Sequence, residues 1–187
     1  MEKLVTDTMM LDADGQRLGG SSEHWIYLTN LKAYNEGFLL GIYLHFPFDQ
    51  SDLDEAYEAI FVGNEFIDKF GYPYEEYFIT DYDAPFSVEE YDSPKSLAEK
   101  YDCLEEYMNY PDEVVRVISN HEGETPTIYE LYEGATDEEK LGYVLVNDGL
   151  IIVPEHLRIY IDYEALGSDY ALNTNGEFAE EHFIEFL

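Results

Sequence analysis

The sequence predicts an α+β fold, with strands first, an acidic helical middle, and a mixed hairpin and helix part at the end. Two early segments, 25–29 and 38–46, are rich in Ile, Leu, Tyr and Phe, which is typical of strands. Two later segments, 52–61 and 93–108, repeat apolar residues at helical spacing. Strand signals and helix signals are thus segregated along the chain, which favours α+β over a regular alternation of strands and helices.

Residues 1–24 are expected to form a flexible leader, because the segment ends in a Gly-Gly-Ser-Ser run typical of linkers. Residues 25–63 are expected to form a β-rich N-terminal subdomain, with a loop over 30–37 between its two strands. A helix is predicted to begin at Asp52, because Asp52 and Glu55 have the spacing of a capping box. The apolar face of this helix consists of Leu53, Ala56, Tyr57, Ile60 and Phe61, and the acidic residues outside it are Asp54, Glu55 and Glu58.

Residues 64–122 are expected to form a central acidic helical subdomain. A strand or extended turn is predicted over 75–82, and Ser93-Pro94 is a typical helix start. The buried stripe of that second helix is predicted to be Leu97, Tyr101, Leu104 and Met108. After Pro111, β-branched residues dominate the segment 114–118, and the pattern leaves helix and strand equally open.

Residues 123–187 are expected to form a C-terminal α+β subdomain. The pattern indicates a helix over 127–133 and then a hairpin of 141–146 with 150–153 across an Asn-Asp-Gly turn. A further helix is predicted to begin at Pro154 and to stop at Gly167. The last ten residues fit either a helix or an edge strand.

Acidic residues outnumber basic ones throughout this chain of 187 residues, 42 against nine, for a net charge of −33. The segment 49–113 alone holds 20 acids and three lysines, yet aromatic residues are interleaved with them. Because disordered acidic segments are poor in aromatic residues, we expect this segment to fold and to fix its charges in space. Such a surface repels nucleic acid and anionic membranes, and it attracts basic partners.

Residue types that carry catalysis or bind metals are scarce. Cys103 is the one cysteine, and its place in an amphipathic helix predicts a core or half-buried thiol rather than a nucleophile. The five histidines lack zinc-site spacing, and no glycine-rich phosphate loop is present. We therefore expect no catalytic residues, no metal and no cofactor. With neither a signal peptide nor a long apolar run, the expected location is cytoplasmic.

Three segments of the sequence form a specific combination through their order and spacing. The first contains Ile26-Tyr27-Leu28-Thr29-Asn30-Leu31, Tyr34-Asn35-Glu36-Gly37 and Gly41. The second is Tyr74-Glu75-Glu76-Tyr77-Phe78-Ile79-Thr80-Asp81-Tyr82-Asp83 with Pro85-Phe86. The third contains Leu141-Gly142-Tyr143, Pro154, and the run Tyr160-Ile161-Asp162-Tyr163-Glu164-Ala165-Leu166-Gly167. Together the three segments resemble the ArdA antirestriction family, and the second is similar to the family's antirestriction segment.

The resemblance implies a DNA mimic encoded by mobile elements such as plasmids or transposons. It further implies an elongated chain of three small subdomains that forms a homodimer through its C-terminal part. Its partner would be a type I restriction-modification enzyme, whose basic DNA-binding groove it would occupy. Since duplex DNA carries one charge per ~1.7 Å, 33 charges correspond to roughly 56 Å of duplex, or about 16 base pairs.

The carboxylates expected to form the DNA-mimic surface lie in the central part of the sequence. They are Asp68, Glu75, Glu76, Asp81, Asp83, Glu89, Glu90, Asp92, Glu99, Asp102, Glu105 and Glu106. Tyr143, Tyr160 and Tyr163 are expected in the C-terminal core or on the pairing surface, and the sequence does not choose between these. The alternative function is an acidic adaptor or chaperone that binds a basic host protein without imitating DNA.

Overall fold

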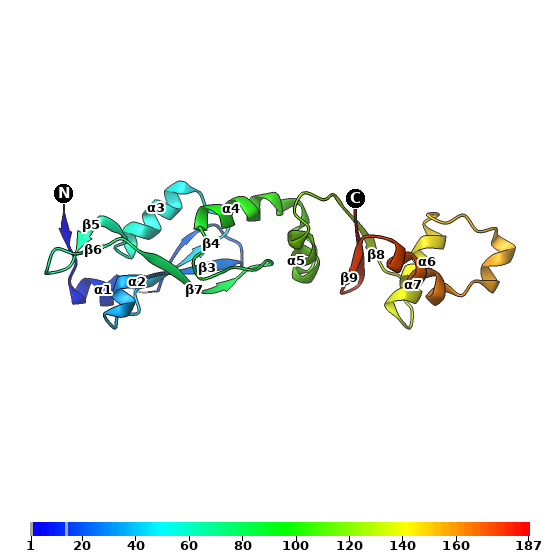
Figure 1. Cartoon of the computed structure of the whole chain (residues 1–187), viewed down its shortest axis with the longest axis horizontal. Helices are drawn as coiled ribbons and strands as arrows, with labels where there is room; N and C mark the ends of the chain where they lie inside the picture. The colour runs from blue at the N-terminus through cyan, green and yellow to red at the C-terminus, as the bar shows by residue number, and fades with distance from the viewer. Residues whose placement is uncertain (1, 14) are drawn as a thin grey trace. The chain divides into compact units, whose positions relative to one another are not determined.

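The computed structural model describes residues 2–13 and 15–187 and confirms the α+β class (Figure 1). The chain separates into two compact units, residues 1–106 and 107–187. Unit 1 holds all twelve predicted surface carboxylates. The further division into subdomains 25–63, 64–122 and 123–187 stays a prediction.

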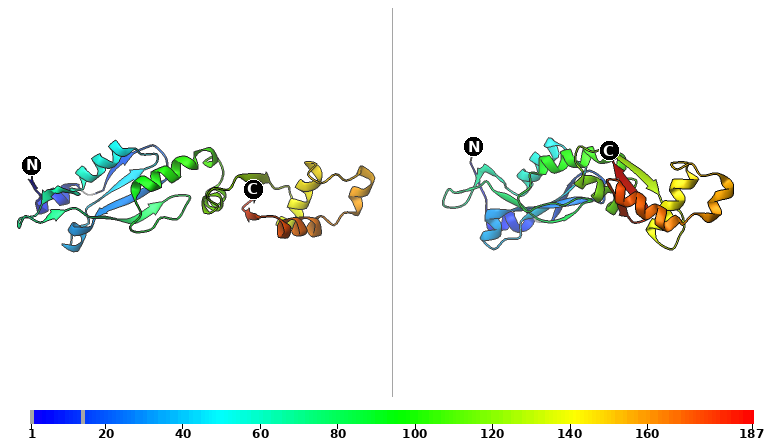
Figure 2. Two further views of the ribbon diagram at one scale, coloured as in Figure 1. Left: turned by 45° about the horizontal axis from the view of Figure 1, so that its top comes forward. Right: turned by 45° about the vertical axis from the view of Figure 1, so that its right-hand side comes forward.

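The main sheet of unit 1 has the strand order β2-β4-β3-β7. Its strands are β2 (Gln16–Gly19), β4 (Gly41–His45), β3 (Trp25–Asn30) and β7 (Tyr77–Asp83). β2 pairs with β4 in parallel, whereas β3 pairs with β4 and β7 in antiparallel register. Helices α3 (Gln50–Ala59) and α4 (Pro94–Cys103) lie along one face of this sheet (Figures 1 and 2). That face buries Ile26, Leu28, Ile42 and Leu44 completely.

The N-terminal residues are part of this unit, and the predicted flexible leader is wrong for the described residues. A second sheet joins β1 (Lys3–Leu4), β5 (Gly63–Ile67) and β6 (Pro73–Tyr74), in the order β1-β5-β6. Helix α1 (Asp7–Ala13) follows β1 and buries Met10 and Ala13. β2 then adds an edge strand to the main sheet, so residues 2–13 and 15–19 are held by backbone pairing and by core contacts.

Two local predictions in unit 1 are shifted. Helix α3 begins at Gln50, and its capping box joins Asp49 to Asp52 rather than Asp52 to Glu55. The predicted loop 30–37 contains helix α2 (Leu31–Asn35), because the Asn30 side chain accepts a hydrogen bond from the Ala33 amide and caps it. The predicted helix start at Ser93-Pro94 is confirmed.

Unit 2 begins with Tyr107, at the end of the short 3₁₀ helix η1 (Glu105–Tyr107), and continues with helix α5 (Asp112–Asn120), which settles the open choice at 114–118. Its sheet has the order β8-β10-β9, formed by Pro126–Glu130, His182–Phe186 and Gly176–Ala179. Helices α6 (Asp137–Asn147) and α7 (Tyr163–Asn173) pack together, and the 3₁₀ helix η2 (Glu155–Tyr160) lies between them in sequence. Leu131, Leu141, Val144, Leu145 and Phe183 form the core.

Several predictions for unit 2 are wrong. Residues 127–130 belong to strand β8 instead of a helix, and 141–146 belong to helix α6 instead of a hairpin. The helix after Pro154 is only the 3₁₀ turn η2, and Gly167 lies inside α7 instead of ending a helix. The C-terminal residues form β10, which is the central strand of its sheet and not an edge strand.

Among the described residues, we find no helix that combines the length and the apolar character needed to cross a membrane.

Candidate acidic interface

The twelve predicted surface carboxylates all lie in unit 1, and ten of them are exposed. Strand β7 is preceded by Glu75 and Glu76 and carries Asp81 and Asp83. The segment between β7 and α4 carries Glu89, Glu90 and Asp92. Helix α4 carries Glu99 and Asp102, η1 carries Glu105 and Glu106, and Asp68 follows β5. The structure thus brings most of the predicted set to the surface around β7 and α4.

Asp68 has a structural role that the sequence did not indicate. Its side chain is only 12% exposed, and Oδ2 accepts a hydrogen bond from Lys32 Nζ at 2.8 Å. Oδ1 accepts the backbone N–H groups of Phe70 and Tyr72 at 2.8 and 2.9 Å. The hydrogen bond from Lys32, together with these amides, lowers the pKa of Asp68 to about 2. We therefore assign Asp68 to holding the β5–β6 turn.

Asp92 also serves the local backbone. It is half-buried, and its Oδ2 accepts the backbone N–H of Glu89 at 2.8 Å. In the same turn, the Ile79 N–H of β7 donates to the Glu90 carbonyl at 2.8 Å. These bonds attach the segment 89–92 to β7, so the exposed carboxylates of Glu89 and Glu90 are fixed beside that strand.

Aromatic packing fixes α4, and with it Glu99 and Asp102. The Tyr101 ring stacks on Phe46 with 4.6 Å between ring centroids, and its Oη donates to Ser22 Oγ at 3.0 Å. A helix that is held in this way keeps its carboxylates at fixed spacing. Lys95 Nζ approaches Glu99 at 4.0 Å, a distance at the limit of an ion pair between exposed groups.

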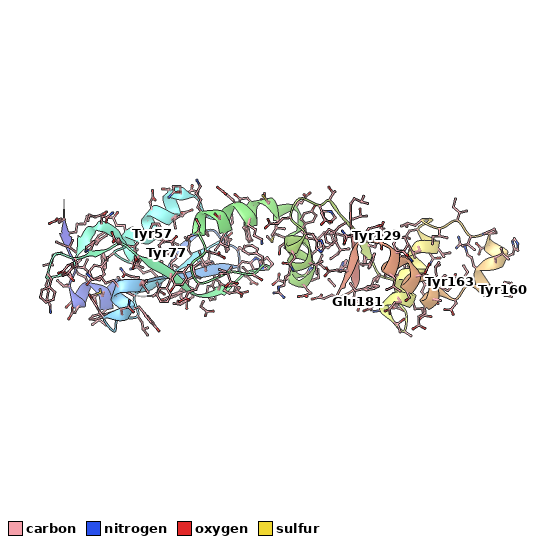
Figure 3. All side chains as sticks on the ribbon, in the orientation of Figure 1. Tyr57, Tyr77, Tyr129, Tyr160, Tyr163 and Glu181 are labelled. Carbon is pink, nitrogen blue, oxygen red and sulfur yellow. The ribbon has the colours of Figure 1, made fainter. Side chains whose placement is uncertain are left out.

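Exposed carboxylates on α3 extend this surface beyond the predicted set. Asp54 and Glu55 are exposed, and α3 packs beside α4 on the same face of the sheet. Tyr57 of α3 contacts Tyr77 of β7 with ring centroids 5.2 Å apart, which anchors the helix (Figure 3). Burial raises the pKa of the Tyr57 hydroxyl. The sequence already placed these two acids outside the apolar stripe of the helix. That position alone does not indicate a binding surface, because the acids of any solvated helix face lie outside the apolar stripe.

Most of the basic side chains are paired within the chain. Lys3 bonds Glu58 at 2.8 Å, Arg116 bonds Glu113 at 2.7 Å, and Lys140 bonds both Asp137 and Glu181. Since the sequence has only nine lysines and arginines for 42 acids, most carboxylates have no cation to neutralise them. The surface therefore presents a strong negative potential to a partner.

Cys103 is exposed at the end of α4, so the prediction of a core or half-buried thiol is wrong. The apolar side of α4 runs through Leu97, Tyr101 and Leu104, and Cys103 lies off it. Within the described residues, no cluster of His, Cys, Asp and Glu has the arrangement of a metal site.

Of the three C-terminal tyrosines singled out from the sequence, two pack together and one is exposed. Tyr143 of α6 and Tyr163 of α7 stack on one another, with 4.2 Å between ring centroids, and serve the helix pair. Tyr160 is 78% exposed on η2 (Figure 3). It belongs to an exposed apolar segment, residues 150–160, in which Ile152 and Ile159 are 92% and 80% exposed.

Comparison with known protein families matches residues 26–185 to the model described as Antirestriction protein (ArdA). The match covers nearly all of the 187 residues, including β7, α4 and all of the predicted surface carboxylates. Among curated proteins, none matches the sequence.

Proposed function

Because this chain belongs to the ArdA antirestriction protein family, we propose that it inhibits type I restriction-modification enzymes by occupying their DNA-binding groove in place of DNA. The protein acts in the cytoplasm, where such an enzyme meets incoming DNA. A mobile element that encodes it would thereby escape cleavage. The chain acts as a binding protein with no catalytic step, and it needs no cofactor.

The observation that carries this proposal is the set of exposed carboxylates on β7, on α4 and on the segments beside them, which far outnumber the basic residues of the chain. Ten of the predicted acids are exposed, and the elements beneath them are fixed by aromatic packing and backbone bonds. A groove that binds duplex DNA is lined by lysines and arginines that contact phosphates. Carboxylates held at fixed positions satisfy the same cations through charge-assisted hydrogen bonds.

Electrostatics sets the expected behaviour of the complex. Binding should weaken as salt rises, because both partners are highly charged and salt screens them within a Debye length of about 8 Å. A protein surface carries no counterion atmosphere as dense as that of DNA, so its salt dependence should be shallower than that of DNA.

Competition with DNA tests the mechanism. The chain is mixed with a purified type I methyltransferase, with and without a duplex that carries the recognition site, and the complexes are separated by gel filtration. Mutual exclusion of the chain and the duplex supports the proposal. A three-way complex supports instead the acidic adaptor, and an affinity independent of salt contradicts the electrostatic mechanism.

We also propose that the chain forms a homodimer through unit 2. The exposed apolar segment 150–160 supports this, since monomeric proteins rarely expose several large apolar side chains together. Leu150 and Leu157 of this segment are also exposed, at 40% and 45%. Pairing would place two acidic surfaces in one assembly and lengthen the stretch of DNA that is imitated.

A further inference from the structure

The main sheet of unit 1 has a second face, opposite α3 and α4, that carries three aromatic rings and two carboxylates. Across the strand pairs, Trp25 of β3 lies opposite Asp83 of β7, and Tyr27 lies opposite Asp81. Tyr27 also lies opposite Tyr43 of β4. Because residues directly opposite one another project from the same side of a sheet, these five side chains share one face. We call them the aromatic-acidic face.

The rings of this face contact one another. Tyr43 meets Trp25 at 5.0 Å and Tyr27 at 4.6 Å between ring centroids, and both contacts are close to edge-on. Tyr43 is 37% exposed, and the other two rings are half-buried. Such edge-to-face contacts hold the rings in place, and Tyr43 keeps part of its ring exposed to solvent.

Helix α2 covers this side of the sheet only near its other end. There Tyr34 packs on Phe78 of β7, with 5.2 Å between ring centroids. In the views of Figures 1 and 2, α3 and α4 lie along the opposite face. The aromatic-acidic face is therefore the less covered part of the main sheet.

Both negative charges of this face lie on β7. Asp81 and Asp83 are both exposed, and within the described residues neither forms an ion pair with a lysine or arginine. Asp81 Oδ1 accepts a hydrogen bond from the neighbouring Tyr82 amide at 2.9 Å. At the β2 edge of the same face, Arg17 lies opposite Tyr43 and adds one positive charge. A cationic partner is thus attracted to the β7 edge.

We propose that the aromatic-acidic face binds arginine side chains of the partner protein. A guanidinium group stacks on the face of a Trp or Tyr ring and donates paired hydrogen bonds to a carboxylate, whereas an ammonium group acts only as a compact point charge. Aromatic rings beside two exposed carboxylates, which have no lysine or arginine partner among the described residues, offer both interactions at once. This inference rests on the proposed function, since it takes the arginines to be those of the enzyme's DNA-binding groove.

Stacking of arginine on these rings would contribute to the affinity in a way that attraction between charges alone does not. Contacts between carboxylates and cations weaken with salt, whereas stacking of guanidinium on an aromatic ring is screened less. The aromatic-acidic face would therefore keep part of the affinity at salt concentrations that dissociate DNA from the same groove.

The single tryptophan of the chain makes this face directly observable. We would titrate the full chain with an octa-arginine peptide and, separately, with an octa-lysine peptide at about 0.15 M salt, and record tryptophan emission. The arginine peptide is expected to change the emission of Trp25 at a several-fold lower concentration than the lysine peptide. Equal responses to both peptides, or no response to either, would overturn the proposal.

Two double variants, each of which removes two negative charges, distinguish peptide binding at this face from nonspecific attraction to the negative chain. D81N/D83N removes the two carboxylates of the face, and E133Q/E180Q removes two exposed carboxylates of unit 2. The first should raise the half-saturating arginine-peptide concentration by several-fold, and the second should change it by less than twofold. Equal effects of the two variants would mean that nonspecific charge explains the binding of the peptide, and this would contradict the inference.

Tyr43 tests the contribution of the rings to enzyme binding. Tyr43→Phe keeps the aromatic ring, whereas Tyr43→Leu keeps only apolar area. With a type I methyltransferase in 0.3 M salt, we expect Tyr43→Leu to raise Kd by about two- to fivefold, and Tyr43→Phe to leave it unchanged. Equal Kd values for the two variants would contradict the role of the ring.

If the unaltered chain fails to bind the methyltransferase, the proposed function fails. The peptide titration contains no restriction enzyme, so its outcome still decides whether this face recognises arginine.

Discussion

Lys32 and Asp68 form the best-defined ion pair of unit 1, and they lie 36 residues apart in sequence. Lys32 Nζ also donates to the Tyr72 carbonyl at 2.8 Å and lies 4.4 Å from the centre of the Tyr74 ring. Asp68 in turn accepts two backbone amides of the β5–β6 turn. Together they fix α2 against the turn, so the charge of Asp68 contributes to the fold rather than to the free acidic surface.

We predict that Asp68→Asn lowers the urea midpoint of unfolding at pH 7. The pKa of Asp68 is about 2 in the folded chain and about 3.9 when unfolded, so its charged form stabilises the fold above the unfolded value. That contribution is lost as pH falls from about 4 to about 2, and the midpoints of the variant and the wild type should converge there. Urea titrations at several pH values measure this.

Glu75→Gln is the control for Asp68→Asn, because Glu75 is exposed and belongs to the same acidic part of the sequence. Its removal should leave the midpoint unchanged or raise it slightly, since it relieves repulsion. A fall as large as that of Asp68→Asn would show that loss of negative charge, and not loss of the specific contacts, destabilises the chain.

At the scale of elements, the pairing of α6 and α7 depends on two glycines. A Cβ atom on Gly142 of α6 would collide with the Tyr163 carbonyl oxygen, and one on Gly167 of α7 would collide with the Glu138 carbonyl oxygen. Both obstacles are backbone atoms, which cannot move aside as a flexible side chain can. The two helices therefore approach so closely that only glycine fits at the crossing.

We predict that Gly167→Ala destabilises unit 2 by about 1–3 kcal/mol, although alanine favours a helix more than glycine does. Steric conflict at the helix crossing outweighs the propensity gain of roughly 1 kcal/mol. Ser168→Ala, one residue further along α7, is the control and should change stability by less than about 0.5 kcal/mol. Thermal unfolding of both variants decides. A stabilised Gly167→Ala would contradict the close crossing.

Gly167 and Gly149 explain why the predictions for this region were wrong. Gly167 resembled a helix stop, and Asn147-Asp148-Gly149 resembled a hairpin turn between two β-branched segments. The stronger signal was Thr136 followed by three acidic residues, which caps α6 and favours its first turn. In unit 1, by contrast, strands β3, β4 and β7 and helices α3 and α4 lie within or overlap their predicted segments, because there propensity, caps and periodicity agree.

The sequence predicted which carboxylates of the candidate site would be exposed, but it did not predict which of them would form structural contacts. Exposure of Glu99 and Asp102 follows from their positions outside the apolar stripe of α4. The contacts of Asp68 with Lys32, and of Asp92 with the Glu89 amide, depend on tertiary structure and on turn geometry, which local patterns do not contain. The aromatic-acidic face likewise depends on strand register, which brings together residues from β3, β4 and β7.

At the scale of the whole molecule, the exposed apolar segment 150–160 predicts the state of association. Ile159→Asp places a charge on a side chain that is 80% exposed, so it should not disturb the core. If unit 2 forms the dimer interface, the variant should become monomeric at concentrations where the wild type is dimeric, as measured by light scattering or sedimentation. Burial of an unpaired carboxylate in an interface is strongly unfavourable.

Leu39→Asp is the matched control for Ile159→Asp, since Leu39 is 73% exposed but lies in unit 1. It should leave the dimer intact. Dissociation by both substitutions would indicate that added negative charge, rather than loss of the apolar contact, separates the chains.

Repulsion among 42 acidic side chains should also make the fold depend on salt. Added sodium chloride screens like charges, so the melting temperature is expected to rise between about 0.05 and 0.5 M salt. Potassium glutamate at matched ionic strength checks that screening, and not chloride binding, is responsible. A melting temperature that falls as salt is added would mean that attractive ion pairs dominate the balance.

Because the exposed carboxylates are spread over several elements, we expect methyltransferase binding to weaken gradually as they are neutralised. Glu99, Asp102, Glu105 and Glu106 are exposed carboxylates near one another in sequence, so they can be changed to Gln or Asn singly and in combination. If binding energy is spread over many contacts, each single change should have a small effect, and the fourfold variant should weaken methyltransferase binding in steps. Each lost contact should also reduce the slope of log Kd against log salt by up to about one. Circular dichroism verifies that every variant stays folded. A folded single variant that abolishes inhibition would instead point to one dominant contact, which is the opposite of how a phosphate backbone is recognised.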